Sequence, residues 1–325
     1  MNKALHELTD CIRAAGRIAL LMHISPDGDT IGSALALYRA FLSMGKAAVV
    51  FCDDAVPRIY ALLPGADQVL PPEAADGAFD LALAVDVADR ARMGRSIALF
   101  DLAARTAQID HHGTNPLYAG VNLVVEPLSS VGVLALQVID ALGVPLDESM
   151  AECLYVAAAT DTGSFKQPNT DAPALRLAAR CVEAGFNPAE TMRRLYDLRP
   201  FAKVKLMGRA FDSLTLRAGG RAALLCVTLS DFAACGALPE LTEGIINYAL
   251  NIEGVIVACL LTERPGQVKC SFRSLEAPES VDVAALAHAF GGGGHVRAAG
   301  CTIEGALGDV TDRVCAAIDK ALFTP

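Results

Sequence analysis

The sequence predicts an α/β protein in which a parallel-sheet N-terminal domain with flanking helices precedes a smaller α/β domain. In the first half, continuous apolar runs alternate with helical segments, and strand-like segments return after residue 214. Apolar strands that alternate with helices are typical of a parallel sheet covered on both faces. With 325 residues, 53% of them apolar and 20% charged, the chain has room for two domains.

The elements of the first half follow from apolar runs and turn residues. An amphipathic helix is expected before residue 18, because charged residues interrupt this segment and it lacks the layout of a signal peptide. A helix is expected at 30–44, where Gly45 ends it, and Gly32 is expected to let this helix approach the sheet. The expected strands lie at 18–22, 47–51, 80–87 and 106–110.

Helices dominate the middle of the chain, from Ser130 to about Tyr196, and 201–211 looks like a connecting helix. The strands expected after it lie at 221–229, 254–262 and 267–274, with a helix near 281–290. We therefore expect a first domain at 1–190, a helical linker at 191–213 and a second domain at 214–325.

Composition excludes some classes of protein. No apolar run approaches the roughly 20 residues that a membrane-spanning helix needs, so no membrane association is expected. The ten cysteines occur singly, without a CxxC pair, which fits reduced thiols in the cytoplasm. A net charge of −10 argues against a basic face that grips long nucleic acid, but it allows a small phosphorylated substrate.

Residue types that bind metals follow the ends of several buried segments. They are His23, Asp27, Asp29, Asp86, Asp110, His111, His112 and Asp161. A buried carboxylate is unfavourable unless a charge pairs with it, and ligands of parallel sheets bind beyond the carboxyl ends of the strands. The pattern therefore predicts a shared pair of divalent cations, with Asp86 suited to bridge them. Oxygen and imidazole ligands favour Mn²⁺ or a similar ion over a structural zinc site of the cysteine type.

Each of these motifs also has a purely structural interpretation. Asp-Gly-Asp at 27–29 is common in turns, Asp89 and Arg90 could form a surface pair, and a His-His pair often lies in a loop. Four clusters in order, each at the end of an expected strand or helix, favour a shared site over these separate explanations.

A second candidate site is the glycine-rich run 291–300, GGGGHVRAAG. Its glycines leave backbone N–H groups free to approach an anion, and a short helix is expected to follow and to point its N-terminus at the same anion. A flexible linker is the alternative, but Phe290 and the Ala-Ala-Gly-Cys continuation resemble core sequence, and the GxxxxGK[ST] pattern of a P-loop is absent. Arg273 closes a strand in the same domain, where it is suited to bidentate phosphate binding or is an exposed strand-end charge.

These motifs resemble those of the DHH phosphoesterase superfamily, which is named for the triplet at 110–112. His23, Asp27 and Asp29 resemble its first motif, and the second half resembles the DHH-associated C-terminal domain. Within the superfamily the chain looks like the compact NrnA-type branch of bifunctional oligoribonucleases and 3′-phosphoadenosine-5′-phosphate (PAP) phosphatases. Added OB-type domains, transmembrane segments and an Arg/Lys-rich C-terminal signature, which mark other branches, are not visible in the sequence.

The resemblance implies a role for each residue. One metal would be held by His23, Asp27 and Asp86, and the other by Asp29, Asp86, His111 and Asp161. His112 would face the scissile phosphate as a catalytic residue, and Asp110 would orient a metal-ligating histidine. The residues implied in substrate binding are Ser130, Arg273, Gly292, Gly293, Gly294 and His295.

The implied function is a two-metal phosphodiesterase that hydrolyses very short RNA, or a linear dinucleotide such as pGpG or pApA, to mononucleotides and also dephosphorylates PAP. The active site would lie in the cleft between the domains, and a homodimer is an assembly that the family allows. A small-molecule phosphatase or pyrophosphatase and a non-catalytic dinucleotide sensor are the alternatives. Departures from the family pattern at Lys166-Gln167-Pro168 and Val296-Arg297 lie near the expected nucleoside, so they leave the preferred substrate open.

Overall fold

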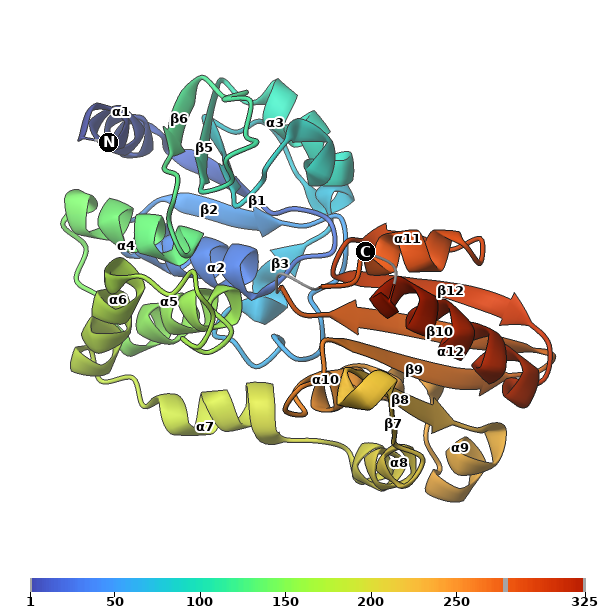
Figure 1. Cartoon of the computed structure of the whole chain (residues 1–325). Helices are drawn as coiled ribbons and strands as arrows, with labels where there is room; N and C mark the ends of the chain where they lie inside the picture. The colour runs from blue at the N-terminus through green and yellow to red at the C-terminus, as the bar shows by residue number, and fades with distance from the viewer. Residues whose placement is uncertain (1, 277–279, 324–325) are drawn as a thin grey trace. The chain divides into compact units, whose positions relative to one another are not determined.

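Two six-stranded sheets organise the chain, and each belongs to its own unit (Figure 1). The structure is a computed structural model that describes residues 2–276 and 280–323. Contacts divide the chain into the units Met1–Leu198 and Arg199–Pro325. Both sheets carry helices, so the predicted α/β class is confirmed, with the smaller unit second. The expected domain boundaries near residues 190 and 214 stay predictions.

The first sheet is parallel throughout. Its strand order is β3-β2-β1-β4-β5-β6, and every neighbouring pair runs parallel. The strands are β1 (Arg17–Leu21), β2 (Ala47–Phe51), β3 (Val69–Leu70), β4 (Leu81–Val85), β5 (Arg105–Asp110) and β6 (Val121–Val124). The expected strands are confirmed, with ends shifted by two residues at most. The short edge strands β3 and β6 have no clear counterpart in the apolar pattern.

Helices cover both faces of this sheet (Figure 1). Because side chains alternate along a strand, Ile18 and Leu20 of β1 enter the larger core, while Ala19 and Leu21 enter the smaller one. The larger core contains α1 (Asn2–Ala14), α2 (Gly28–Ser43), α4 (Val131–Leu142), α5 (Glu148–Asp161) and α6 (Ala172–Glu183). The smaller core contains α3 (Ile97–Leu102) and the 3₁₀ segment Arg90–Ser96. After α6 the unit ends with α7 (Pro188–Met192) and a π-helical turn, Arg193–Asp197.

Helix α2 is central to the first unit because most of its residues are buried. The side chain of Asp27 caps its N-terminus by accepting hydrogen bonds from the amides of Asp29 and Thr30. Contrary to expectation, Gly32 faces α5 and not the sheet. A Cβ atom at Gly32 would lie 2.3 Å from the carbonyl oxygen of Cys153 in α5, so this glycine lets the two helices pack closely.

The second sheet is mixed. Its order is β11-β12-β10-β9-β8-β7; β8 and β9 run parallel, and the other neighbouring pairs run antiparallel. The strands are β7 (Thr215–Arg217), β8 (Ala222–Val227), β9 (Val257–Arg264), β10 (Gln267–Ser274), β11 (Gly293–His295) and β12 (Ala298–Glu304). The strand expected at 267–274 is confirmed with the same bounds, and those expected at 221–229 and 254–262 are confirmed with shifted ends.

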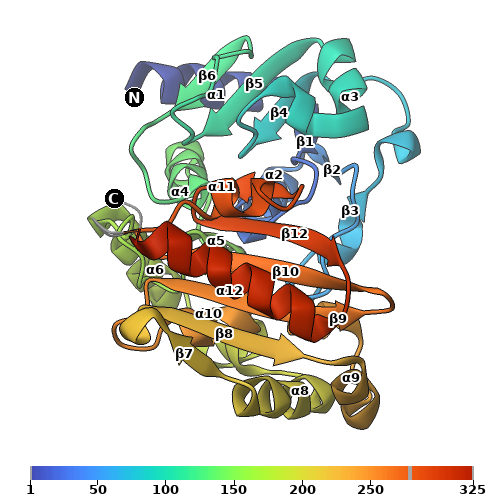
Figure 2. The ribbon, with the colours of Figure 1, turned by 45° about the vertical axis from the view of Figure 1, so that its right-hand side comes forward.

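Helices also pack on both faces of the second sheet. One face carries α8 (Phe201–Asp212), α9 (Leu229–Cys235) and α10 (Ile245–Leu250). The other carries α11 (Val283–His288) and α12 (Leu307–Phe323), and Figure 2 shows α12 lying across the strands. Leu206 and Ala210 place α8, which falls in the expected linker, in the core of this unit. None of the helices in the described part of the chain is long and apolar enough to span a membrane.

Candidate active site

Three neighbouring strands of the first sheet end at the candidate site. β1, β4 and β5 lie side by side, and His23, Asp86 and His111 stand within two residues of their carboxyl ends. Asp29 lies in the first turn of α2, and Asp161 is the last residue of α5. The fold therefore brings side chains from five segments of the sequence to one edge of the sheet.

The first group of candidate ligands consists of His23, Asp27 and Asp86. Nε2 of His23 lies 3.7 Å from Oδ1 of Asp27 and 3.8 Å from Oδ2 of Asp86. Nδ1 of the same ring lies 2.7 Å from the backbone oxygen of Ile24. Because a carbonyl oxygen only accepts hydrogen bonds, Nδ1 carries the proton and Nε2 presents its lone pair to the carboxylates. This is the tautomer that a metal ligand needs.

The second group consists of Asp29, His111 and Asp161. Nε2 of His111 lies 4.0 Å from Oδ2 of Asp29 and 3.7 Å from Oδ2 of Asp161. Its Nδ1 lies 2.8 Å from the backbone oxygen of Leu128. His111 therefore has the same tautomer as His23, with Nε2 free to bind a cation.

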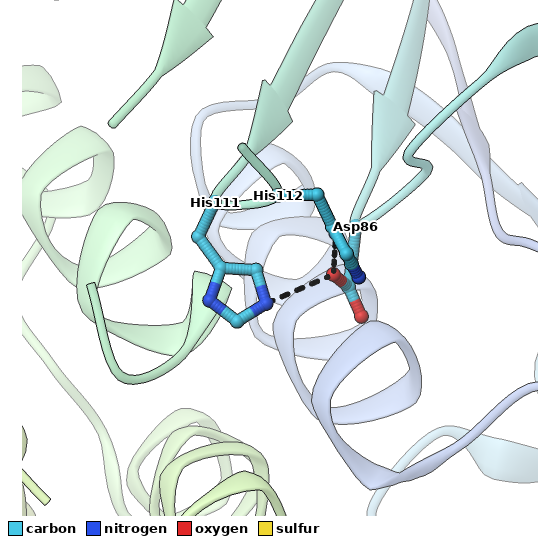
Figure 3. A group of neighbouring side chains, drawn as sticks. All are labelled: Asp86, His111 and His112. Carbon is cyan, nitrogen blue, oxygen red and sulfur yellow. Dashed lines mark ion pairs between the residues drawn. The ribbon is translucent and has the colours of Figure 1, made fainter. Parts of the chain in front are cut away.

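Asp86 joins the two groups through different oxygens. Its Oδ2 faces His23, while its Oδ1 lies 3.7 Å from Nε2 of His111 and 3.6 Å from Nδ1 of His112. Figure 3 shows the carboxylate of Asp86 lying beside both of these latter rings. A carboxylate that offers one oxygen to each of two neighbouring groups has the geometry of a bridging ligand.

The electrostatics of this cluster fit divalent cations. Oδ1 of Asp86 is buried and has no hydrogen-bond partner among the residues that the structure describes. The backbone of Asp86 has φ = 59°, in the left-handed region that is uncommon for residues other than glycine. Burial, followed by the charges of Asp29 and Asp27, raises the pKa of Asp86. Carboxylates crowded in this way need a compensating positive charge, which bound cations supply.

Asp29 is held by the N-terminus of α4. Its Oδ1 accepts from the Ser130 hydroxyl at 2.8 Å and from the Gly132 amide at 3.0 Å, and its Oδ2 accepts from the Val131 amide at 2.7 Å. Even so, burial and then the charge of Asp161 raise the pKa of Asp29 to about 7. Ser130 is among the residues expected to bind substrate. Its side chain is fully buried, and its hydroxyl donates a hydrogen bond to the Asp29 carboxylate.

Asp110 contacts His112 rather than a ligand of either group. Its Oδ1 lies 2.8 Å from Nδ1 of His112, and its Oδ2 accepts from the Asn115 side chain at 2.5 Å. The Leu128 carbonyl holds Nδ1 of His111, so the histidine that Asp110 can orient is His112, which with Asp86 and His111 forms a third group of possible metal ligands. That Asp110 orients a metal-ligating histidine stays a prediction. Hydrogen bonding to Asp110 raises the pKa of His112, while burial opposes the shift.

The structure adds residues to the site that the motifs do not single out. Asn115 fixes Asp110 from the same loop, four residues after His111, and Ser33 donates a hydrogen bond to Asp29 at 3.2 Å. Ser33 lies one turn of α2 after Asp29, so helical spacing from a predicted ligand could have found it. Arg92 lies beside His23, but nothing in the sequence distinguishes it from the neighbouring arginines.

A left-handed turn follows Asp161. Gly163, Ser164 and Phe165 have φ values of 55°, 63° and 60°, and a left-handed conformation is strained for the two that carry a Cβ atom. The side chain of Asn169 then donates to the backbone oxygen of Asp161 at 3.0 Å. The turn and this bond together fix the end of α5. Residues 166–168, where the sequence departs from the family pattern, are exposed.

In the second unit, strand register aligns Arg273 with His295. Both residues are paired with Ala298 of β12, Arg273 from β10 on one side and His295 from β11 on the other. Directly paired residues of neighbouring strands point to the same face of a sheet, so the two side chains flank a small alanine. Cys270 and Phe272, which alternate with Arg273 along β10, point to the other face, into the core that α11 and α12 cover. The sheet therefore presents an arginine and a histidine together on one face.

The glycine-rich run forms a hairpin, and the expected short helix after it is absent. Gly293 to His295 form β11, only Val296 and Arg297 separate it from β12, and two residues leave no room for a helix. Gly294 has φ = 142°, and a Cβ atom there would lie 2.6 Å from the carbonyl oxygen of Ala298. The close approach of the two strands thus explains why glycine stands at this position.

Comparison with known proteins identifies the family. Residues 17–158 match the model of the DHH family, N-terminal domain, and residues 233–322 match the DHHA1 domain. The bifunctional oligoribonuclease and PAP phosphatase NrnA of Thermus thermophilus is 33% identical over 310 residues, which cover 94% of this chain and 90% of the relative. The chain therefore belongs to the DHH family. The resemblance found from the motifs is confirmed, as is the predicted class of hydrolase acting on phosphate esters.

Solved structures share the fold. A crystal structure of an exopolyphosphatase-related protein from Bacteroides fragilis superposes with a TM-score of 0.82 at 23% identity, covering 100% of this chain and 98% of the other. A crystal structure of exonuclease RecJ bound to manganese superposes with a TM-score of 0.53 at 18% identity, covering 99% and 94%. At these identities the likeness establishes the architecture of both units.

Proposed function

We propose that this protein hydrolyses the phosphodiester bond of very short RNA and of linear dinucleotides such as pGpG and pApA, releasing mononucleotides. The observation that carries the proposal is Asp86, which offers one carboxylate oxygen to each of two ligand groups. A pair of cations held in this way is suited to displacement at phosphorus. The name of the Thermus thermophilus relative, an oligoribonuclease, supports the substrate class.

The proposed cofactors are two divalent cations, with Mn²⁺ as the metal. His23, Asp27 and Asp86 would hold one; Asp29, Asp86, His111 and Asp161 would hold the other. The donors are carboxylate oxygens and imidazole nitrogens, the set that suits Mn²⁺. Bound cations would neutralise charge on the phosphate and activate a water molecule for attack.

His112 is proposed as the catalytic histidine. Asp110 holds its Nδ1 atom at 2.8 Å, which leaves Nε2 as the ring nitrogen available to a substrate. Asp110 also raises the pKa of His112, so the ring keeps its proton to a higher pH. A protonated His112 would stabilise the charge that develops on the phosphate and donate a proton to the leaving oxygen.

Substrate binding is proposed for the face of the second sheet that carries Arg273 and His295. Arg273 supplies a fork of N–H donors for a phosphate. On the other side of β12, Gly293 and Gly294 of β11 and the preceding Gly292 carry no side chain that would keep a phosphate from their backbone. A phosphate held at one place suits a short substrate. The net charge of −10 agrees, since no long backbone has to be bound.

Three finer points belong to the same proposal. PAP is proposed as a second substrate, because the Thermus thermophilus relative is named as a PAP phosphatase. A cytoplasmic location is proposed because all ten cysteines are free thiols. The homodimer, the domain boundaries at 190 and 214, and an active site in a cleft between the domains remain predictions from the sequence.

The test is Mn²⁺-dependent hydrolysis of pApA, pGpG, short 5′-phosphorylated RNA, PAP and pyrophosphate. Release of mononucleotides that is lost in Asp86→Ala and His111→Ala would support the proposal. Asp76→Ala is the matched control, because Asp76 is an exposed carboxylate that pairs with Arg17 on the surface. Turnover of PAP or pyrophosphate alone would make the protein a small-molecule phosphatase. Tight dinucleotide binding without any turnover would make it a sensor.

A further inference from the structure

Arg92 occupies a fixed position next to the first ligand group. It lies in the 3₁₀ segment Arg90–Ser96 after β4, and its Nη2 atom is 3.3 Å from Nδ1 of His23. The backbone oxygen of Arg92 accepts from the amide of Ile24 at 2.7 Å, and its own amide donates to the Asp89 carboxylate at 3.2 Å. These bonds tie the segment to the loop that carries His23, so the half-buried side chain is presented to the site by rigid backbone.

The contact with His23 gives the guanidinium no hydrogen-bond acceptor. Nδ1 of His23 already donates to the Ile24 carbonyl, and a guanidinium has donors only, so these two groups cannot hydrogen-bond to each other. No carboxylate in the described parts of the chain lies within ion-pair distance of Arg92. Its neighbours differ, because Arg90 pairs with Asp101, and Arg95 pairs with Asp53 and Glu73.

The neighbour of Arg92 belongs to the candidate metal centre. His23, which the guanidinium contacts at 3.3 Å, forms one ligand group with Asp27 and Asp86. The guanidinium therefore lies at the edge of this group. A cation without an anionic partner in the described structure, held beside a candidate metal ligand, is suited to a phosphate oxygen.

We propose that Arg92 binds a non-bridging oxygen of the scissile phosphate, and of the phosphate of the mononucleotide product. This proposal rests on the phosphodiesterase function proposed above. The fork of N–H donors would hold the phosphate beside Asp86 and His112 and stabilise the charge that develops on it.

The test compares Arg92→Met and Arg92→Lys with Arg90→Met as the matched control. Arg90 is an exposed arginine of the same segment whose partner is Asp101. For each protein we would measure kcat and KM on pApA at saturating Mn²⁺, the affinity for Mn²⁺, and the affinity of the Mn²⁺-loaded protein for AMP. Arg92→Met is expected to lower kcat/KM by about 10²- to 10³-fold and AMP affinity at least tenfold, with Mn²⁺ affinity unchanged. Arg92→Lys should recover only part of this loss, since lysine keeps the charge without the fork.

Other results would overturn the phosphate contact of Arg92 or separate it from the proposed function. If Arg92→Met cleaves pApA and binds AMP as Arg90→Met does, the proposal is overturned. It is also overturned if Arg92→Met lowers Mn²⁺ affinity and excess Mn²⁺ restores wild-type kcat/KM, because Arg92 would then only position His23. If the wild type cleaves no substrate while AMP binding still depends on Arg92, the proposed function fails and the phosphate contact stands.

Discussion

Oδ1 of Asp110 lies 2.8 Å from Nδ1 of His112, and Asp110 is fully buried while His112 is partly exposed. The carboxylate is fixed in turn by Asn115. Within the DHH triplet, the first and third residues therefore form one unit, and the middle residue, His111, points to the carboxylates of the second ligand group. The local chain thus directs Nδ1 of His112 to Asp110 and Nε2 of His111 to the candidate metal ligands.

Replacing Asp110 by Asn is expected to move the pH dependence of catalysis. The carboxylate raises the pKa of His112, so its removal lowers that pKa. If protonated His112 donates the proton, activity falls as pH rises through its pKa, and the basic limb of kcat should shift to lower pH in Asp110→Asn. The measurement is kcat against pH on pApA at saturating Mn²⁺. Asp101→Asn, a surface change, should leave the limb in place. An unshifted limb in Asp110→Asn would remove His112 from the proton-donor role.

Ser130→Ala is expected to weaken Mn²⁺ binding rather than substrate binding. The hydroxyl is buried and donates to Asp29, so its loss leaves a candidate ligand less well held. Losing a partner that orients a ligand typically lowers metal affinity about 10- to 100-fold. Titration of Mn²⁺ with the apoprotein would measure this, with Ser43→Ala at the end of α2 as the control. Unchanged Mn²⁺ affinity with a raised KM for pApA would instead favour direct substrate contact.

The metal-free protein is expected to lose stability as pH rises toward neutrality. Burial, followed by the charge of Asp161, raises the pKa of Asp29 to about 7, above its value in the unfolded chain. Between about pH 4 and pH 7 the folded state therefore binds more protons at this group, and the free energy of unfolding falls with increasing pH. The rise in melting temperature caused by Mn²⁺ should be larger at pH 7.5 than at pH 5.5. Asp29→Asn should reduce this difference between the two pH values, and an equal Mn²⁺ effect at both in the wild type would contradict the account.

Gly294→Ala is expected to destabilise the second unit. Gly294 adopts φ = 142°, and an added Cβ atom would meet the backbone of Ala298 and Ala299 at 2.6 Å. Forcing a residue with a side chain into such a conformation costs roughly 1–3 kcal/mol. Urea unfolding would report the loss. Gly308→Ala in α12 is the matched control, since nothing lies within 4 Å of its added Cβ and alanine favours a helix. Equal stability of the two variants would show that the hairpin tolerates a side chain.

Much of the first unit can be predicted from the sequence, because strong physical signals mark it. Buried parallel strands leave continuous apolar runs, and the carboxyl ends of adjacent strands meet at one edge. The sequence alone therefore places His23, Asp86 and His111 together, and the strand order agrees. Strands without a continuous apolar run cannot be predicted in this way. β3 has only two residues, and β11 consists of Gly-Gly-His, which has no apolar alternation.

The finer contacts of the site cannot be predicted, because they depend on tertiary packing. The sequence does not reveal which histidine Asp110 contacts. Nδ1 of His111 is bound to the backbone oxygen of Leu128, which lies 17 residues further along the chain, and this contact depends on the fold. Ser130 falls among the expected substrate-binding residues, although its burial depends on how α4 packs against α2. Arg92 stands among three arginines at 90–95, and only its lack of an anionic partner in the described structure separates it from the other two.

The central claim is that Asp86 bridges two cations, and the most direct measurement is the number of Mn²⁺ ions bound per active chain. We predict two, with magnetic coupling between them in the EPR spectrum, and we predict that Asp86→Ala loses the coupling, at least one ion and the hydrolysis of pApA. Asp76→Ala should keep both ions, their magnetic coupling and the hydrolysis of pApA. A fully active protein that holds a single uncoupled Mn²⁺ ion, or an Asp86→Ala variant that retains two coupled ions, would contradict the account.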